Sequence, residues 1–234
     1  MSLPIAVLVS GSGSNLQSII DRIEQGVLDA EIKLVISNKA RAFGIERAKK
    51  HNIPYKVLLH TEFRSREDFD QAMVDAITEA GVGEDGLVVM AGFMRIVTPV
   101  FLSAFANRVI NIHPALLPSF PGVDGQGDAA DYGVKIAGCT VHFVEEKMDH
   151  GPVIIQAAVP CQAGEDGNEL SPRILKMEHR IFPQAIQWYA EGRLKVNDRH
   201  VDLRVSGKRC AGQPKADLEP STYALVWPPL EEGF

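Results

Sequence analysis

The first 110 residues alternate short apolar runs with segments of helical spacing, and this pattern constrains the fold more than any other feature. Five runs have the length and composition of buried strands, at residues 5–9, 32–36, 55–59, 87–90 and 108–112. Apolar residues recur at helical spacing between them, with a short last helix expected at 99–105. Because parallel strands require crossover connections, the pattern predicts an α/β fold. We expect a doubly wound, mostly parallel Rossmann-like sheet with flanking helices, in a single domain.

The pattern changes after Gly122. Two further strands are expected at 139–144 and 153–160, joined by a charged loop, and a long amphipathic helix at 170–191 with Pro183 as a kink. The remaining proline-containing residues predict a hairpin or a loose tail that wraps the surface. The predicted organisation is therefore one domain over residues 1–195, with a change of character near residue 110, followed by a tail over 196–234.

Composition excludes several classes of protein. The chain has 234 residues, of which 45% are hydrophobic and 23% charged, an ordinary globular balance. Its net charge of -6 argues against a nucleic-acid-binding surface. No apolar run approaches the roughly 18 residues that a membrane span needs, and the N-terminus lacks the features of a signal peptide. We expect a cytoplasmic protein, with Cys139, Cys161 and Cys210 as free thiols because they have no metal-ligand spacing.

The end of the strand near residue 110 carries the most suggestive pair of side chains. Asn111 and His113 are spaced i, i+2, so in a strand they point to the same face. An amide and an imidazole together can hold a carbonyl oxygen and transfer a proton. Three prolines, Pro114, Pro118 and Pro121, stiffen the chain that follows. The spacing therefore predicts a reaction centre at this strand end.

A glycine-rich turn follows the first strand. Gly11, Ser12, Gly13, Ser14 and Asn15 lie between the strand and the next helix, where backbone N–H groups and the helix dipole favour an anion. The pattern matches neither the dinucleotide fingerprint nor the triphosphate-binding loop, and it fits a phosphomonoester better. The alternative is a tight strand-to-helix turn with a Ser or Asn cap.

Three other features have both a chemical and an ordinary structural interpretation. The loop at 93–97 lines a pocket for a flat aromatic ligand, or else packs beneath the next helix. Asp149 pairs with His113 and favours the imidazolium, or else is a solvated turn residue, which is the commoner case. His142 supports the catalytic loop, or else is a half-buried strand histidine. The remaining histidines have no carboxylate at ligand spacing, so no metal is predicted.

Taken together, these residues resemble the phosphoribosylglycinamide formyltransferase family, folate-dependent enzymes of purine biosynthesis. The resemblance covers residues 5 to about 195 and rests on motifs that occur in the family's order. The motifs are Ser10 to Asn15, Ser37 to Ala40, Ala91 to Arg95, Asn111 to Pro118, Gly138 to Val144 and Asp149 to Ile154.

The resemblance implies the formyltransferase fold and transfer of a formyl group from 10-formyltetrahydrofolate to the amine of glycinamide ribonucleotide. It also implies a phosphate-binding half at about 1–110 and a folate-binding, catalytic half at about 111–195. The expected partners are these two small molecules, with no nucleic acid, membrane or metal, in a monomer or a homodimer. Carried over by position, the implied catalytic trio is Asn111, His113 and Asp149, with His142 in support.

The resemblance further implies binding roles for three sets of residues. The glycine-rich turn, Gly11, Ser12, Gly13, Ser14 and Asn15, receives the substrate phosphate. Met94, Pro114 and Glu178 contact the ribonucleotide. The folate pocket is expected to contain Arg95, Ile96, Val97, Val144, Glu145, Glu146 and Met148.

The chain departs from the family pattern at Asp124, where the family usually has a histidine. The glycines and aspartates of residues 123–130 predict a flexible loop over the substrate site with altered charge. Formyltetrahydrofolate hydrolase, which shares the trio but delivers the formyl group to water, is the nearest alternative, although that enzyme carries an N-terminal regulatory domain. Methionyl-tRNA formyltransferase is expected not to fit, because it needs a C-terminal barrel and a basic surface. A catalytically impaired nucleotide-binding homologue is the alternative from another class.

Overall fold

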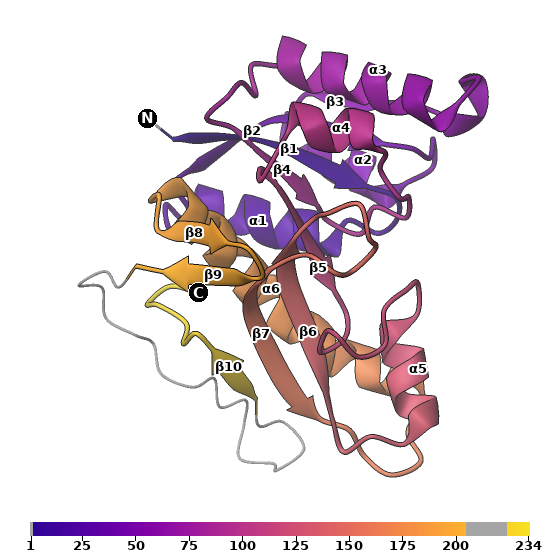
Figure 1. Cartoon of the computed structure of the whole chain (residues 1–234), viewed down its shortest axis with the longest axis vertical. Coiled ribbons are helices and arrows are strands. Elements are labelled where there is room, and N and C mark those ends of the chain that lie inside the picture. The colour runs from indigo at the N-terminus through magenta and orange to yellow at the C-terminus, as the bar shows by residue number, and fades with distance from the viewer. Residues whose placement is uncertain (1, 205–223) are drawn as a thin grey trace. The chain divides into compact units, whose positions relative to one another are not determined.

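The alternating segments of the first half form a parallel sheet with helices on its two faces (Figure 1). The computed structural model describes residues 2–204 and 224–234, so Cys210 and the middle of the predicted tail, residues 205–223, lie outside the described residues. The chain divides into two compact units. The first unit comprises Met1–Asn111 and Phe143–Glu146, and the second Ile112–His142 and Lys147–Phe234.

The first unit contains the predicted order of strands and helices. Its strands pair in parallel in the order β3-β2-β1-β4-β5, which confirms the prediction of a doubly wound, mostly parallel sheet. Its elements are β1 Leu3–Val9, α1 Ser14–Glu24, β2 Ala30–Ser37, α2 Phe43–Lys50, β3 Tyr55–Val57, the 3-10 turn η1 His60–Glu62, α3 Arg66–Glu79, β4 Leu87–Met90, α4 Pro99–Ala104 and β5 Val109–His113.

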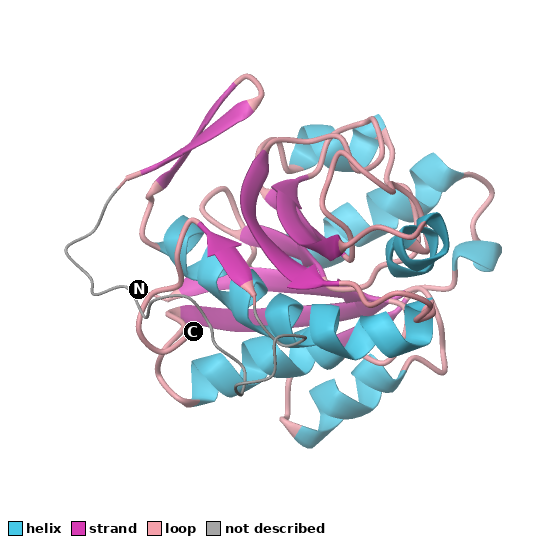
Figure 2. Cartoon of the chain, turned by 90° about the horizontal axis from the view of Figure 1, so that it is seen from below, coloured by secondary structure: helices cyan, strands magenta, loops and turns pink. Residues whose placement is uncertain are grey.

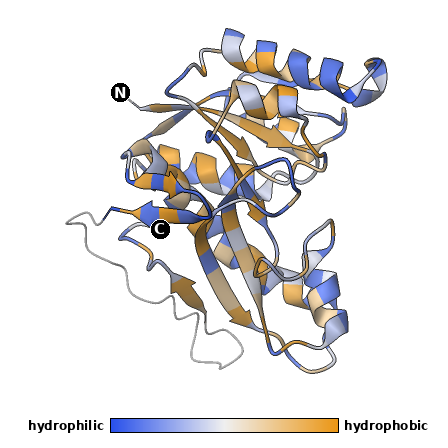
Figure 3. Cartoon of the chain, in the orientation of Figure 1, coloured by the Kyte–Doolittle hydropathy of each residue, from blue (hydrophilic) through white to orange (hydrophobic). Residues whose placement is uncertain are grey.

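Alternating side chains of the strands build the core of this unit. Ala6 and Leu8 of β1 face the buried side chains of α3 and α4, among them Met73 and Phe101. The intervening residues of β1 are equally buried and point to the opposite face, on the side of α1 (Figure 1). Figure 3 shows the apolar character of the strands beside the mixed polarity of α3. All five parallel strands thus end at one edge, where the loops can carry a site.

The second unit is built around antiparallel strands and one long helix. β7 pairs antiparallel with β6 on one side and with β10 on the other. The bounds are α5 Gly125–Tyr132, β6 Ile136–Phe143, β7 Val153–Pro160, α6 Gly167–Ala190, β8 Leu194–Asn197, β9 His200–Leu203 and β10 Leu225–Trp227.

Helix α6 begins three residues before the predicted position because of its cap. Asp166 accepts hydrogen bonds from the backbone N–H groups of Asn168 and Glu169, and the Glu169 carboxylate accepts from the Asp166 N–H. This capping box satisfies donors that the first turn would otherwise leave unpaired. The helix then continues past both Pro172 and Pro183.

The expectation of a flexible loop over residues 123–130 is wrong, because most of this segment is helix α5. Asp124 is its N-cap, and its carboxylate accepts the backbone N–H of Gly127 at 3.1 Å. Gly127 and Gly167 also lie so close that a Cβ built on Gly167 would be 2.8 Å from the Gly127 Cα. The small residues that suggested flexibility instead allow α5 to pack against the start of α6.

The second unit includes a hairpin that follows α6. β8 and β9 form this antiparallel hairpin, drawn in Figure 2, and the predicted start of the tail at residue 196 falls inside β8. Among the described residues, no helix is long and apolar enough to cross a membrane.

Arg193, directly before β8, joins α6, the hairpin and the last described residues. Its guanidinium donates to Glu231 at 2.7 Å and Glu191 at 2.9 Å, and its Nε donates to the Arg204 carbonyl at 2.8 Å. Both Arg193 and Glu231 are buried. Removing the Arg193 guanidinium would take this ion pair away from the buried Glu231 carboxylate.

We predict that Arg193→Met lowers the free energy of unfolding by about 3 kcal/mol, because Glu231 loses its buried partner. Urea denaturation followed by circular dichroism measures this. Lys195→Met is the matched control, since Lys195 is exposed on β8. A loss of less than about 1 kcal/mol for Arg193→Met, as expected of a surface pair, would contradict the assignment.

Candidate active site

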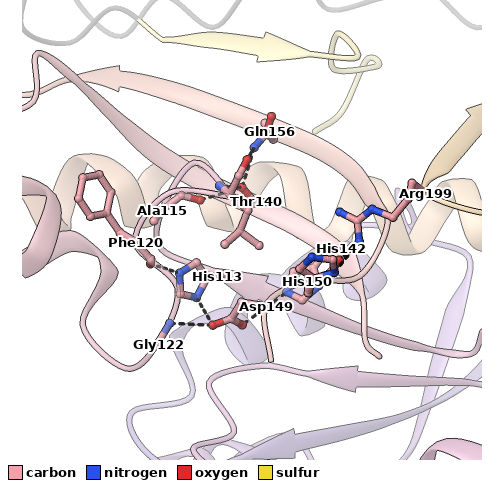
Figure 4. Close-up of polar contacts among 11 residues, drawn as sticks. His113, Ala115, Phe120, Gly122, Thr140, His142, Asp149, His150, Gln156 and Arg199 are labelled. Carbon is pink, nitrogen blue, oxygen red and sulfur yellow. Dashed lines mark hydrogen bonds and ion pairs between the residues drawn. The ribbon is translucent and has the colours of Figure 1, made fainter. Parts of the chain in front are cut away.

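His113 lies at the end of β5, and its contact with Phe120 shows which ring nitrogen carries a proton. The ring is 3% exposed, and its Nε2 lies 2.8 Å from the Phe120 carbonyl oxygen (Figure 4). A carbonyl oxygen can only accept, so Nε2 carries the proton. The other nitrogen, Nδ1, is therefore the position whose proton depends on its neighbour.

That neighbour is Asp149. Its Oδ2 lies 3.6 Å from His113 Nδ1 and accepts the Gly122 N–H at 2.8 Å. Its Oδ1 lies 3.9 Å from His142 Nε2, and all three side chains are nearly buried. The structure thus brings together His113 of β5, His142 of β6 and Asp149 of the β6–β7 loop (Figure 4). A carboxylate placed between two imidazoles can accept a proton from either ring and return it.

Asp149 and Phe120 both have an unusual backbone conformation. Phe120 has φ of 52° and Asp149 has φ of 53°, in the left-handed region that residues other than glycine seldom adopt. Such conformations persist only where the surrounding structure holds them, and they are common at functional sites. Here they accompany the Phe120 carbonyl that accepts from His113 and the Asp149 carboxylate that faces it.

Thr140 and Gln156 hold the turn after His113, and the residue patterns did not indicate them. Thr140 Oγ1 donates to the Ala115 carbonyl at 2.7 Å and accepts the Leu117 N–H at 3.1 Å. Gln156, its partner in the β6–β7 register, donates to the Leu117 carbonyl and to Thr140 Oγ1. The signal was present in the sequence as polar residues within two otherwise apolar strands.

A second unpredicted contact comes from the β8–β9 turn. Arg199 donates to the His150 carbonyl and lies 2.9 Å, through its Nη1, from His150 Nδ1 (Figure 4). Because a guanidinium only donates, His150 Nδ1 is an acceptor in this contact. The hairpin thus supports the loop that carries Asp149. No sequence pattern links an arginine at this distance to the site.

The first residue of α5 packs against the His113 ring. A Cβ built on Gly125 would lie 3.1 Å from His113 Nε2, 3.2 Å from the Phe120 oxygen and 3.0 Å from the Ala115 Cβ. Asp124, where the family usually has a histidine, caps this helix rather than lying in a flexible loop. Its role as the cap places Gly125 next to the imidazole.

Asn111 belongs to the same strand as His113. It is half-buried, and the strand alternation directs its side chain to the same face as the imidazole two residues on. The predicted amide and imidazole pair therefore occurs at the carboxyl end of β5.

The glycine-rich turn of the first unit has the features of an anion site. Gly13 is the N-cap of α1 with φ of 67°, and the first turn of α1 carries no acidic side chain. A Cβ built on Gly13 would be 2.6 Å from the Gly44 Cα, so only glycine fits here. Arg47 Nε donates to the Ser12 carbonyl at 2.9 Å and holds the turn from α2.

Ser10 links this turn to the loop after β4. Its hydroxyl donates to Asn38 Oδ1 at 2.6 Å and accepts the Met94 N–H at 2.8 Å. Met94 and Ile96 are exposed by 59% and 51%, whereas Phe93 and Val97 belong to the core. For Phe93 and Val97 the ordinary alternative therefore holds, because their side chains pack inward instead of lining a pocket.

The other predicted site residues are distributed between the two units. Pro114 is half-buried and Glu178 is buried in the second unit, and Met148 there is exposed. Arg95 and Val144 of the first unit are half-buried, and Glu145 and Glu146 are exposed. Burial, followed by the charge of Glu178, raises the pKa of Cys139 well above its usual value, so this thiol stays protonated. Cys139 and Cys161 are both free and buried.

Within the part of the chain that the structure describes, no group of three or more His, Cys, Asp or Glu side chains has the arrangement of a metal site.

Comparison with known proteins shows the family to which the chain belongs. The model of the family described as "Formyl transferase" matches residues 3–186, and this single match confirms the single-domain prediction for that range. Phosphoribosylglycinamide formyltransferase of Escherichia coli K12 is 43% identical over 194 residues, 83% of this chain and 90% of its own.

Solved structures agree with this match. Glycinamide ribonucleotide transformylase 1 from Symbiobacterium toebii superposes with a TM-score of 0.84 at 46% identity, over 86% of this chain and 94% of its own. The phosphoribosylglycinamide formyltransferase from Coxiella burnetii, solved with CHES, gives a TM-score of 0.81 at 40% identity, over 87% and 94%. The chain therefore belongs to the formyl transferase family, among the phosphoribosylglycinamide formyltransferases.

Proposed function

We propose that this protein transfers the formyl group of 10-formyltetrahydrofolate to the amine of glycinamide ribonucleotide, a step of purine biosynthesis in the cytoplasm. The observation that carries the proposal is the buried His113–Asp149 pair, at 3.6 Å, next to Asn111 on the same strand. Proteins related over most of the chain have names that state formyl transfer to this ribonucleotide.

The site residues have roles that follow from their chemistry. The amine nitrogen attacks the formyl carbon, a new C–N bond forms, and the carbonyl oxygen becomes an oxyanion. Asn111 donates a hydrogen bond to that oxygen, a contribution of about 3 kcal/mol in comparable sites. Protonated His113 stabilises the same charge, and Asp149 holds the imidazolium, with His142 on its other side.

Completion of the reaction requires a proton to move. The amine loses a proton after attack, and the folate nitrogen gains one as its bond to the formyl carbon breaks. Asp149 is the group that we assign to this relay, directly or through water, because it faces two imidazoles. Atoms and charge then balance, with a formamide product and tetrahydrofolate.

The two substrates are assigned to different parts of the chain. We assign the ribonucleotide phosphate to the turn of residues 11–15, within a half at about 1–110, and the folate to a half at about 111–195 together with the loop at 95–97. Met94, Pro114 and Glu178 contact the ribonucleotide. The folate contacts are Arg95, Ile96, Val144, Glu145, Glu146 and Met148, with Val97 acting through its backbone because its side chain is buried. The active form is a monomer or a homodimer.

The direct test follows the absorbance change on conversion of 10-formylfolate, with and without glycinamide ribonucleotide. We expect turnover only when the amine is present. Equal turnover without the amine would identify a hydrolase instead, and no turnover in either case would favour a nucleotide-binding protein without activity.

The packing of Gly125 against His113 gives a second test. We predict that Gly125→Ala lowers kcat about tenfold to a hundredfold, because a methyl group at 3.1 Å from Nε2 must displace the ring. Gly83→Ala is the control, since a Cβ there meets no atom within 4 Å. An unchanged kcat in folded Gly125→Ala enzyme would show that the ring position is not critical.

A further inference from the structure

The loop of residues 94–98, here called the donor loop, leaves β4 and enters α4. Its exposed members Met94 and Ile96 alternate with residues that face inward. The proposed function assigns the segment 95–97 of this loop to the formyl donor. A loop that binds a ligand must have its backbone held in place, because a displaced backbone also displaces the groups that contact the ligand.

One face of α3 makes three consecutive contacts with the donor loop. Arg66 donates to the Ile96 carbonyl at 2.8 Å, and the Arg95 guanidinium lies over the Phe69 ring at 5.4 Å. Asp70 Oδ2 accepts the Thr98 N–H at 2.5 Å. Residues 66, 69 and 70 are spaced i, i+3, i+4, so they lie on one helix face. Together they hold three of the five loop residues, at positions 95, 96 and 98.

Asp70 is unusual among these residues because it is a nearly buried carboxylate, only 2% exposed. Burial raises its pKa, while the hydrogen bond from Thr98 and the charges of Arg66 and Arg95 act in the opposite direction. A buried carboxylate is costly unless it is hydrogen-bonded and paired. The Thr98 N–H of the donor loop supplies the hydrogen bond, and the charges of Arg66 and Arg95 favour the ionised carboxylate, so Asp70 fixes the Thr98 end of the loop.

We propose that this face of α3 sets the backbone conformation of the donor loop, with Asp70 and Arg66 as positioning residues for the formyl donor. The proposal rests on the proposed function, because it concerns the pocket that the function assigns to 10-formyltetrahydrofolate. Neither residue is expected to touch the reacting atoms. Their effect is therefore on donor binding, not on the chemical step or on the ribonucleotide.

The test uses Arg66→Ala, an exposed change that does not threaten folding, together with Asp70→Ala and Asp70→Asn. We expect the KM for 10-formyltetrahydrofolate to rise about tenfold in the two alanine variants and less in Asp70→Asn, which keeps an acceptor for the Thr98 N–H. The KM for glycinamide ribonucleotide and the kcat at saturating donor stay within about twofold. Matched controls are Arg64→Ala and Asp75→Asn, which remove the same charges at exposed positions.

Calorimetric titration with 10-formyltetrahydrofolate separates this proposal from the function on which it depends. If the unmodified protein binds no donor, the proposed function fails. If it binds donor and the Arg66→Ala and Asp70→Ala variants bind it equally well, only the role of α3 is overturned. A parallel rise of both KM values would also overturn it, because that pattern indicates general damage to the fold.

Discussion

The hydrogen bond from His113 Nε2 to the Phe120 carbonyl, at 2.8 Å, fixes the proton of one ring nitrogen and turns the other toward Asp149. Much of the second unit serves this geometry. Thr140 and Gln156 hold the turn that leads from His113 toward Phe120, and α5 presents Gly125, a residue without a side chain, to the ring. Arg199 supports the loop that carries Asp149.

The first unit carries two loops that we assign to substrate binding, each at the carboxyl end of a parallel strand. The glycine-rich turn after β1 and the donor loop after β4 are joined through Ser10, whose hydroxyl bonds to both Asn38 and the Met94 N–H. Two helices support these segments from behind: Arg47 of α2 holds the turn, and Arg66 and Asp70 of α3 hold the donor loop. The loops that we assign to substrate binding thus depend on helix side chains that need not touch a ligand.

The residues that could be predicted from sequence are those whose position follows from local periodicity. The parallel sheet and the Asn111–His113 pair follow from strand spacing, because alternation decides which side chains share a face. Asp149 could not be told from a turn aspartate by spacing, and only the family motif singled it out. Gln156, Arg199 and Asp70 depend on tertiary contacts across 28 to 49 positions. Helix α5 was missed because its glycines suggest a loop. In the structure they allow close packing, Gly127 against α6 and Gly125 against His113.

The central claim is that His113 and Asp149 act as one unit in the chemical step, and a double-mutant cycle on kcat tests it most directly. The variants are His113→Asn, Asp149→Asn and the combination of both. Groups that act together are strongly non-additive, so the account predicts that the double variant is no more than about twofold slower than the slower single variant. Rate losses that multiply in the double variant would contradict the account, because they would show that the two side chains contribute independently.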